Sequence, residues 1–226
     1  SGVTCASASS SALAAMTTSL VACRNDAGAT PLHCAAQYLE LNGLAFFEML
    51  LEAAPSHVCE TSNKSGWTPL HHFTQRFAPA LSSDDCDGEL WRLFLVLLRK
   101  APAVVGCAPA SGDTPLHLAA HANRNVIGPH AARLLSAMIA ASPAAAAAAC
   151  ATRGKAQRTP LEWLPAGDVL YNECDEILSH RAARCLELLL DAHPPAAEAA
   201  TPDTGDLALH QLCAAEPPIL TPRMLK

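Results

Sequence analysis

The sequence predicts an all-α protein, built as a solenoid of repeated helix pairs with hairpin loops projecting from one side of the stack. A short motif that starts with threonine and proline recurs along the 226 residues. A longer apolar segment with helical spacing follows each of the first four copies. The chain is 50% hydrophobic but only 4% aromatic, so its core depends on small residues that let helices approach closely.

The motif has three near-complete copies and two degenerate ones. The copies are Thr30-Pro-Leu-His-Cys-Ala-Ala, Thr68-Pro-Leu-His-His-Phe-Thr, Thr114-Pro-Leu-His-Leu-Ala-Ala, Thr159-Pro-Leu-Glu-Trp-Leu-Pro and Leu207-Ala-Leu-His-Gln-Leu-Cys. Glycine stands two residues before four of these starts, at Gly28, Gly66, Gly112 and Gly205. The fourth copy instead has Gln157 at that place and Glu162 in place of histidine.

Each part of the motif has a physical reason. Threonine caps a helix by accepting a hydrogen bond from a free backbone N–H, and proline fits the first helical position because it lacks a donor there. The glycine permits a tight turn just upstream. We assign structural roles to Thr30, Pro31, His33, Thr68, Pro69, His71, Thr114, Pro115, His117, Thr159, Pro160 and His210.

A second helix follows each of the first four copies and ends before a proline. The ends are marked by Leu50-Leu51 with Pro55, Leu97-Leu98 with Pro102, Met138-Ile139 with Pro143, and Leu189-Leu190 with Pro194. Proline just beyond each pair stops the helix. One such helix pair cannot bury its own apolar faces, so we expect the pairs to stack.

The combined pattern of motif, glycine and second helix resembles the ankyrin repeat. This resemblance implies L-shaped units, each with a hairpin loop (a finger) at right angles to its helix pair, and a concave surface formed by fingers and first helices. It also implies that the motif histidines bond to nearby backbone. Specificity in such arrays is expected from exposed residues that vary between units.

The chain is predicted to be a single array over residues 1–226. We expect a partial repeat at 1–27, repeats at 28–65, 66–111, 112–156 and 157–204, and a truncated repeat at 205–226. The motif starts lie 38, 46, 45 and 48 residues apart, against about 33 in the family. The largest insertions are expected around Phe77–Gly88 and Pro165–Glu173, and Gln157 puts the geometry of its finger in doubt.

Both ends of the chain fit a segment of a longer array. Ala12–Cys23 is predicted to be the second helix of the partial repeat, ahead of a turn at Asn25–Gly28. Thr221-Pro222 opens a further helix. Asp206 is a candidate cap in the last repeat, one residue before the lost threonine.

Composition and motifs argue against catalysis and nucleic-acid binding. The net charge is −6 and the charges are interspersed, so the basic field that nucleic acids need is missing. Successive motif histidines should lie about 10 Å apart, too far to share a metal ion. The acidic segment at 84–89 fails as a calcium loop because Phe94 occupies the twelfth position, so we interpret it as a solvated insertion in which Asp87 caps the next helix.

Three further features have ordinary explanations as well as functional ones. Cys150, beside Arg153 and Lys155, could have a lowered pKa, but an incidental thiol is favoured because no base accompanies it. The alanine run at 144–149 is expected to be filler in a finger, with a helical extension as the alternative. The uncharged stretch at 134–152 is divided by Pro143, so no membrane span is predicted.

We expect no enzyme activity, cofactor or metal. The ten scattered cysteines indicate free thiols in a reducing intracellular compartment, the cytoplasm first and a plastid or mitochondrion as the alternative.

Partner contacts are predicted where residues differ between repeats. Trp67, just before a motif threonine and near Lys64 and Asn63, is the leading candidate, with packing against the adjacent finger as its alternative. Asp113, Arg158 and Asp206 hold equivalent or nearby positions, and Arg153, Lys155 and Arg158 form a basic finger that fits an acidic patch or a solvated loop. On the first helices, the candidates are Gln37, Tyr38, Gln75, Arg76 and His121.

The leading functional hypothesis is a protein-binding adaptor or scaffold. The alternative is a structural or assembly subunit of a large organellar complex, with or without association of that complex with a membrane. A third hypothesis is a regulatory array joined to an enzyme outside this segment. The expected partner is another protein or protein complex, with neither nucleic acid nor a membrane span of the chain's own.

Overall fold

The computed structural model describes residues 19–38, 44–62, 64–80, 88–121, 131–154, 157–164, 176–202, 204–207 and 210. Its named helices are α2 (Pro31–Gln37), α4 (Leu44–Ala53), η1 (Pro55–Cys59), α5 (Pro69–Ala80), α6 (Glu89–Lys100), η2 (Pro102–Gly106), α7 (Pro115–His121), α8 (Ala131–Ala141), α9 (Pro143–Ala151), α10 (Pro160–Trp163), α11 (Glu176–Ala192) and η4 (Pro194–Ala197). Within these ranges, the β-type pairing is limited to one isolated antiparallel bridge between Ala200 and Leu207. The all-α prediction is confirmed.

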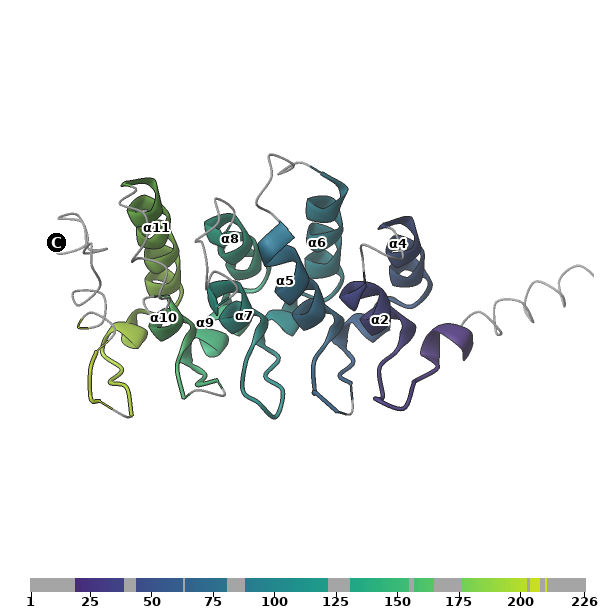
Figure 1. Cartoon of the computed structure of the whole chain (residues 1–226), viewed down its shortest axis with the longest axis horizontal. Coiled ribbons are helices and arrows are strands. Elements are labelled where there is room, and N and C mark those ends of the chain that lie inside the picture. The colour runs from purple at the N-terminus through teal and green to yellow at the C-terminus, as the bar shows by residue number, and fades with distance from the viewer. Residues whose placement is uncertain are drawn as a thin grey trace, which may run out of the picture.

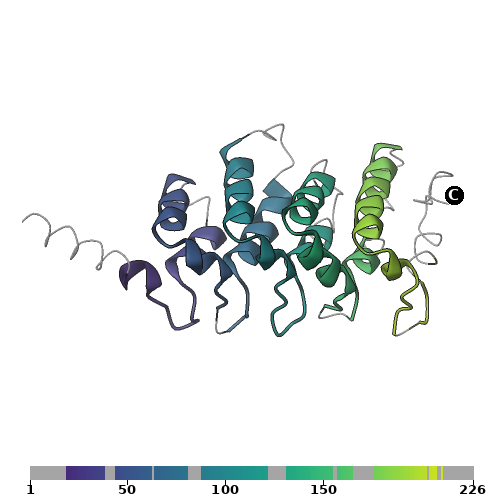
Figure 2. The same ribbon diagram turned by 180° about the vertical axis from the view of Figure 1, so that it is seen from behind.

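The helices form two parallel rows. The first helices α2, α5, α7 and α10 pack one against the next, and so do the second helices α4, α6, α8 and α11. Figure 1 shows the first row in front with the fingers projecting together from one side, and Figure 2 shows the second row from behind. Each first helix also contacts the second helix of its own repeat, so the repeats stack as an elongated array.

Threonine and proline open each first helix as predicted. The helices begin at Pro31, Pro69, Pro115 and Pro160. The paired alanines behind the histidine are fully buried in α2 and α7, where Ala36 and Ala119 have no exposed surface. Such small side chains let neighbouring first helices approach closely.

The core is continuous from one repeat to the next. Phe47 of α4 lies 5.7 Å from Phe73 of α5, and Phe73 lies 5.9 Å from Phe94 of α6, measured between ring centroids. All three side chains are fully buried. Apolar burial across these junctions joins the repeats into one cooperative unit.

The proline after each second helix does more than end it. The second helices stop before Pro55, Pro102, Pro143 and Pro194, as predicted, but each proline also opens a short helix: η1, η2, α9 and η4. Proline suits a first helical position as well as a stop. This third helical element was missed in the sequence.

The alanine run was assigned wrongly to a finger. It forms α9, in which Ala146, Ala149 and Cys150 are buried. The helix packs closely on η2, since a Cβ added to Gly106 would lie 3.1 Å from the carbonyl oxygen of Ala145. A run of alanines makes a helix that fits into a narrow space.

Several predicted features fall partly or wholly outside the described residues. Of the helix predicted over Ala12–Cys23, residues 19–22 are described and helical, and they precede their finger as η1 precedes the next one. The insertion segments 81–87 and 165–173, with Asp87, and the Thr221-Pro222 start lie outside. The N-cap of α6 is Gly88 rather than Asp87.

Among the described helices, none is long and apolar enough to cross a membrane alone. The helices α8 and α9 would pass together on length and composition, but they meet at a bend of 117°.

Candidate partner-binding surface

The fingers share a left-handed residue two positions before the motif, although the hydrogen bonds that close them differ. In the second finger, the Ser62 N–H donates to the Trp67 carbonyl and the Gly66 N–H donates to the Ser62 carbonyl, both at 2.9 Å. The glycine two residues before the motif has a positive φ of 68° here, which glycine adopts without steric cost.

The fourth finger keeps this left-handed residue although glycine is replaced. Gln157 has a φ of 56°, and Gly28, Gly66, Gly112 and Gly205 lie between 68° and 82°. The finger is closed by a 2.9 Å hydrogen bond from the Gly154 N–H to the Arg158 carbonyl. The finger whose geometry was in doubt is therefore left-handed at Gln157, as the others are at glycine, and the glutamine accepts strain of about 1 kcal/mol.

Two of the motif histidines, His33 and His117, join their repeat to the next finger. The Thr30 N–H donates to His33 Nδ1 at 3.2 Å, so the ring proton sits on Nε2. Nε2 then donates to the Trp67 carbonyl at 3.1 Å. His117 repeats this arrangement, with the Thr114 N–H at 3.1 Å and the Arg158 carbonyl at 3.1 Å. These neutral rings are therefore structural links between repeats.

His71 shows the cost of burying such a ring. The Thr68 N–H donates to its Nδ1 at 3.0 Å, but its Nε2 is buried without a hydrogen-bond partner among the described residues, unlike that of His33 or His117. Burial lowers the pKa of His71 to about 3. Burial likewise lowers the pKa of His33 and of His117, so all three rings are uncharged near neutral pH.

In the fourth repeat, an ion pair replaces the histidine. The Thr159 N–H donates to Glu162 Oε2 at 2.8 Å, and Arg153 Nη1 lies 3.1 Å from the same oxygen. Arg153 also donates to the Gln157 carbonyl at 2.7 Å and to the Ala200 carbonyl of the next finger at 2.8 Å. This predicted member of a basic finger thus lies within the array, holding two fingers together.

Arg24 makes the same clamp at the front of the array. It donates to the Gly28 carbonyl at 2.6 Å, to the Thr61 carbonyl of the next finger at 3.0 Å, and to Glu60 at 2.7 Å. Arg24 and Arg153 both stand six residues before a motif threonine. That shared position was the signal that our sequence reasoning missed.

In the repeats that start at Thr68 and Thr159, the residue before the motif threonine packs on the first helix of its own repeat. Trp67 lies 5.1 Å from His72, and the Arg158 guanidinium lies 5.6 Å from the Trp163 ring, measured to ring centroids. Trp67 also stacks on His71 at 5.9 Å. All these partners but His71 are half-buried. The two pairs occupy equivalent places, so they form a row along the base of the fingers.

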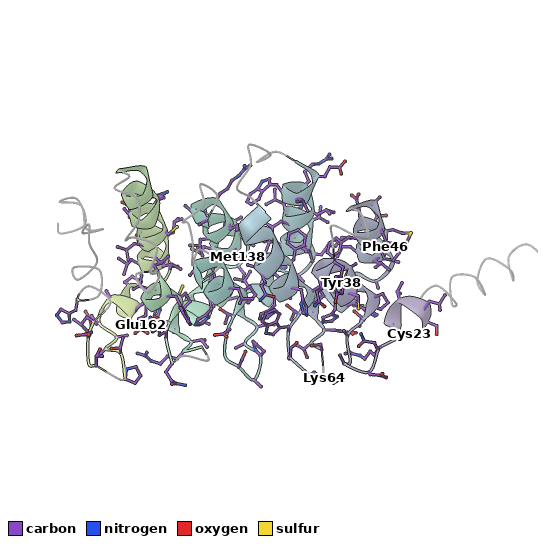
Figure 3. The ribbon with its side chains drawn as sticks, in the orientation of Figure 1. Cys23, Tyr38, Phe46, Lys64, Met138 and Glu162 are labelled. Carbon is purple, nitrogen blue, oxygen red and sulfur yellow. The ribbon has the colours of Figure 1, made fainter. Side chains whose placement is uncertain are left out.

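The exposed candidates flank this row. Tyr38, at the end of α2, is 43% exposed, and Gln75 is exposed. Lys64 is exposed near the tip of a finger, and Figure 3 shows it well below Tyr38. Gln37 is half-buried. These side chains and the row define what we call the concave surface.

Two acidic candidates are tied into the fingers. Asp113 is half-buried and so close to the next finger that a Cβ on Gly154 would collide with its carboxylate. Asp206 accepts a hydrogen bond from Thr204 Oγ1 at 2.7 Å. Asn63 and Lys155 lie outside the described residues, as do the side chains of Arg76 and His121.

His72 presents a neutral ring on the concave surface. Burial, followed by the charge of His33, lowers the pKa of His72 to about 4. The ring meets His33 edge-on, with 6.1 Å between centroids. An uncharged imidazole beside a tryptophan can be covered by a partner without desolvating a charge.

The described residues contain no group of three or more His, Cys, Asp or Glu side chains placed to hold a metal ion. The possibility of a reactive Cys150 is not supported, because burial raises the pKa of its thiol to about 11. A nucleophilic thiol needs the opposite shift.

One comparison with known proteins gives a match. The family model described as "Ankyrin repeat" matches residues 111–145, from the finger before Thr114 through α7 and α8 into α9. No curated protein matches the chain.

Proposed function

Because the chain is an ankyrin-repeat protein, we propose that it is a non-catalytic adaptor or scaffold that binds a partner protein through its concave surface. Ankyrin repeats generally mediate protein–protein interaction. The finer assignment of the site to fingers and first helices rests on the geometry of this chain.

The observation that carries the proposal is the row of paired side chains at the base of the fingers. Trp67 against His72 and Arg158 against Trp163 place aromatic and guanidinium groups in a half-buried setting. Tryptophan, tyrosine and arginine dominate binding energy at interfaces when a partner covers them. Packing within each pair also restrains these side chains beforehand, which reduces the entropy lost on binding.

The repeats supply a rigid support for this row. The bonds of His33 and Arg24 hold the second finger, that of His117 holds the fourth, and that of Arg153 holds the fifth, each to the repeat before it. A partner that spans several fingers then meets a surface of fixed shape.

The six cysteines in the described residues are unpaired, which supports a reducing compartment.

The test is capture of partners from native extract, followed by mass spectrometry. Tyr38→Ala and Trp67→Ala should each weaken capture of the same partner, by about 2 kcal/mol or about thirtyfold in affinity for the tryptophan. Both variants must keep the far-ultraviolet circular dichroism of the unmodified protein.

Phe46→Ala is the matched control. Phe46 is 42% exposed, nearly the same as Tyr38, but it lies on α4, in the second row of helices. Capture should be unchanged in this variant. Equal recovery of every partner by all three variants would remove the concave surface as the site.

A further inference from the structure

The second row of helices carries two outer stripes of opposite charge. On α4 the acidic stripe consists of Ala45, Glu48, Met49 and Glu52, and on α6 the basic stripe consists of Arg92, Leu95, Val96 and Arg99. Each has the spacing that puts four residues on one face of a helix. Measured from the paired leucines, Leu50-Leu51 and Leu97-Leu98, the two stripes occupy equivalent positions in adjacent repeats.

Both stripes face outward. All four residues of the acidic stripe are exposed, and Met49 is 55% exposed. In the basic stripe, Arg92 and Arg99 are exposed, and the two apolar residues between them are half-buried. Figure 2 shows α4 and α6 side by side on the face turned away from the first helices.

A shallow groove of about 880 Å³ runs beside the basic stripe. Its walls come from α4 and α6, and α8 contributes the small side chains of Ala137, Ala140 and Ala141. Two acids also line it, Glu48 of the acidic stripe and Glu89 at the start of α6. The groove is therefore open and largely apolar, with Glu48 on its α4 side and the two arginines on its α6 side.

The charges of the stripes have no partners within the described part of the chain. Some described charges do pair, as in Arg24 with Glu60 and Arg184 with Glu187. No described residue forms an ion pair with Glu48, Glu52, Arg92 or Arg99. One face of the protein therefore exposes unpaired acids on α4 and unpaired bases on α6, on either side of the groove.

We propose that this face binds a second copy of the chain, with the acidic stripe of each copy lying against the basic stripe of the other. The stripes occupy equivalent positions along α4 and α6. A two-fold axis that lies between the two copies and runs parallel to both helices therefore places α4 of one copy opposite α6 of the other, with equivalent positions at the same height. Glu52 then meets the partner's Arg99, and Met49 meets the partner's Val96. The symmetry makes each contact twice.

The chemistry favours reversible pairing. Met49 loses its exposure by entering the groove, and each carboxylate gains a guanidinium at a solvent-accessible rim. Rim charges mainly set partner choice and association rate, so salt should weaken the dimer. The proposal does not depend on the concave surface, which lies on the other row of helices and stays free in the dimer.

The experiment is sedimentation equilibrium of the full chain from about 1 to about 200 µM, a range that covers weak association. Two variants reverse the charges: Glu48→Arg with Glu52→Arg, and Arg92→Glu with Arg99→Glu. Asp191→Arg on α11 is the control, since Asp191 is also exposed in the second row. Circular dichroism checks that every variant is folded.

The unmodified chain and the control should dimerise, each reversed variant alone should be monomeric, and an equimolar mixture of the two should dimerise again. The mixture restores both contacts because opposite stripes then face each other. Three results overturn the proposal. The first is an unmodified chain that stays monomeric throughout, which is expected if another protein's acidic helix binds in the groove. The second is a dimer that survives both charge reversals, and the third is a mixture that stays monomeric.

Discussion

Arg153 contacts both carboxylate oxygens of Glu162 through one nitrogen, Nη1, at 3.3 Å from Oε1 and 3.1 Å from Oε2. Glu162 is fully buried and stands where the other repeats have histidine. Its carboxylate caps the helix as an imidazole would, but it cannot donate to the next finger. Arg153 links this repeat to the next finger through the Ala200 carbonyl, as Arg24 does through the Thr61 carbonyl in a repeat that keeps its histidine.

Replacing Arg153 with methionine should lower the free energy of unfolding by about 3 kcal/mol, because a buried carboxylate loses its charge partner. Urea unfolding followed by circular dichroism measures this. Adding Glu162→His to the same chain should recover most of the loss, since a neutral imidazole caps the helix and donates onward. No recovery would mean that Arg153 acts other than through Glu162.

The exposed pair of Arg184 with Glu187 is the control for that measurement. Their side chains are 60% and 44% exposed. Exposed pairs contribute about 0–1 kcal/mol, so Arg184→Met should change stability far less than Arg153→Met.

Alanine at Gly112 should cost more than alanine at Gly205, although both glycines have positive φ, at 82° and 72°. The backbone strain is common to both and amounts to about 1–2 kcal/mol. At Gly112 the new methyl would also lie 2.7 Å from the Arg153 carbonyl, whereas at Gly205 nothing lies within 4 Å. Each variant loses a certain free energy of unfolding relative to the unmodified protein. The difference between the two losses measures the contact between adjacent fingers at Gly112, and equal losses would contradict that contact.

Gln157→Gly should stabilise the protein by about 0.5–1 kcal/mol, because it relieves the left-handed strain but adds freedom to the unfolded chain. A rise in the midpoint of thermal unfolding would show this. Gln157→Val should have the opposite sign, since a β-branched residue tolerates positive φ poorly. Destabilisation by glycine would show that the glutamine side chain has a role of its own.

Acid should destabilise the array through its buried histidines. Burial lowers the pKa of His71 to about 3 and that of His72 to about 4, from 6.5. The unfolded chain then binds more protons than the folded one below pH 6.5. Stability is therefore fully present above about 6.5 and falls as the pH drops toward these folded values.

The measurement is the free energy of unfolding between about pH 7.5 and about pH 4.5, inside the range where these rings titrate in the unfolded chain. His72→Phe is the informative variant, because phenylalanine keeps a ring against Trp67 and cannot be protonated. Its profile should fall less steeply with acid than that of the unmodified protein. Parallel profiles would exclude His72 as a contributor.

The sequence was sufficient for helix starts and stacking because local chemistry decides them. Threonine followed by proline has few alternatives to a helix N-terminus, and α2, α5, α7 and α10 all begin at that proline. The histidine links were available only through the resemblance, since nothing local in the chain reveals that His33 reaches Trp67.

The wrong predictions concern residue types that can play two different structural roles. Pro143 was interpreted only as a stop, and the following alanines have no apolar periodicity to indicate a helix, so α9 was missed. Arg153 was assigned to the surface because its partner Glu162 and acceptor Ala200 become neighbours only after stacking. Trp67 packs on His71 and His72 while it stays partly exposed, and the sequence could not decide between packing and exposure for this residue.

The imidazole links give the array an orientation. The N–H of His33 or His117 always points to a carbonyl in the following unit. Deleting units from the back would remove the acceptor of such a donor and expose the imidazole to water, whereas deleting them from the front would free an acceptor. Shortening this protein therefore exposes different groups at its two ends.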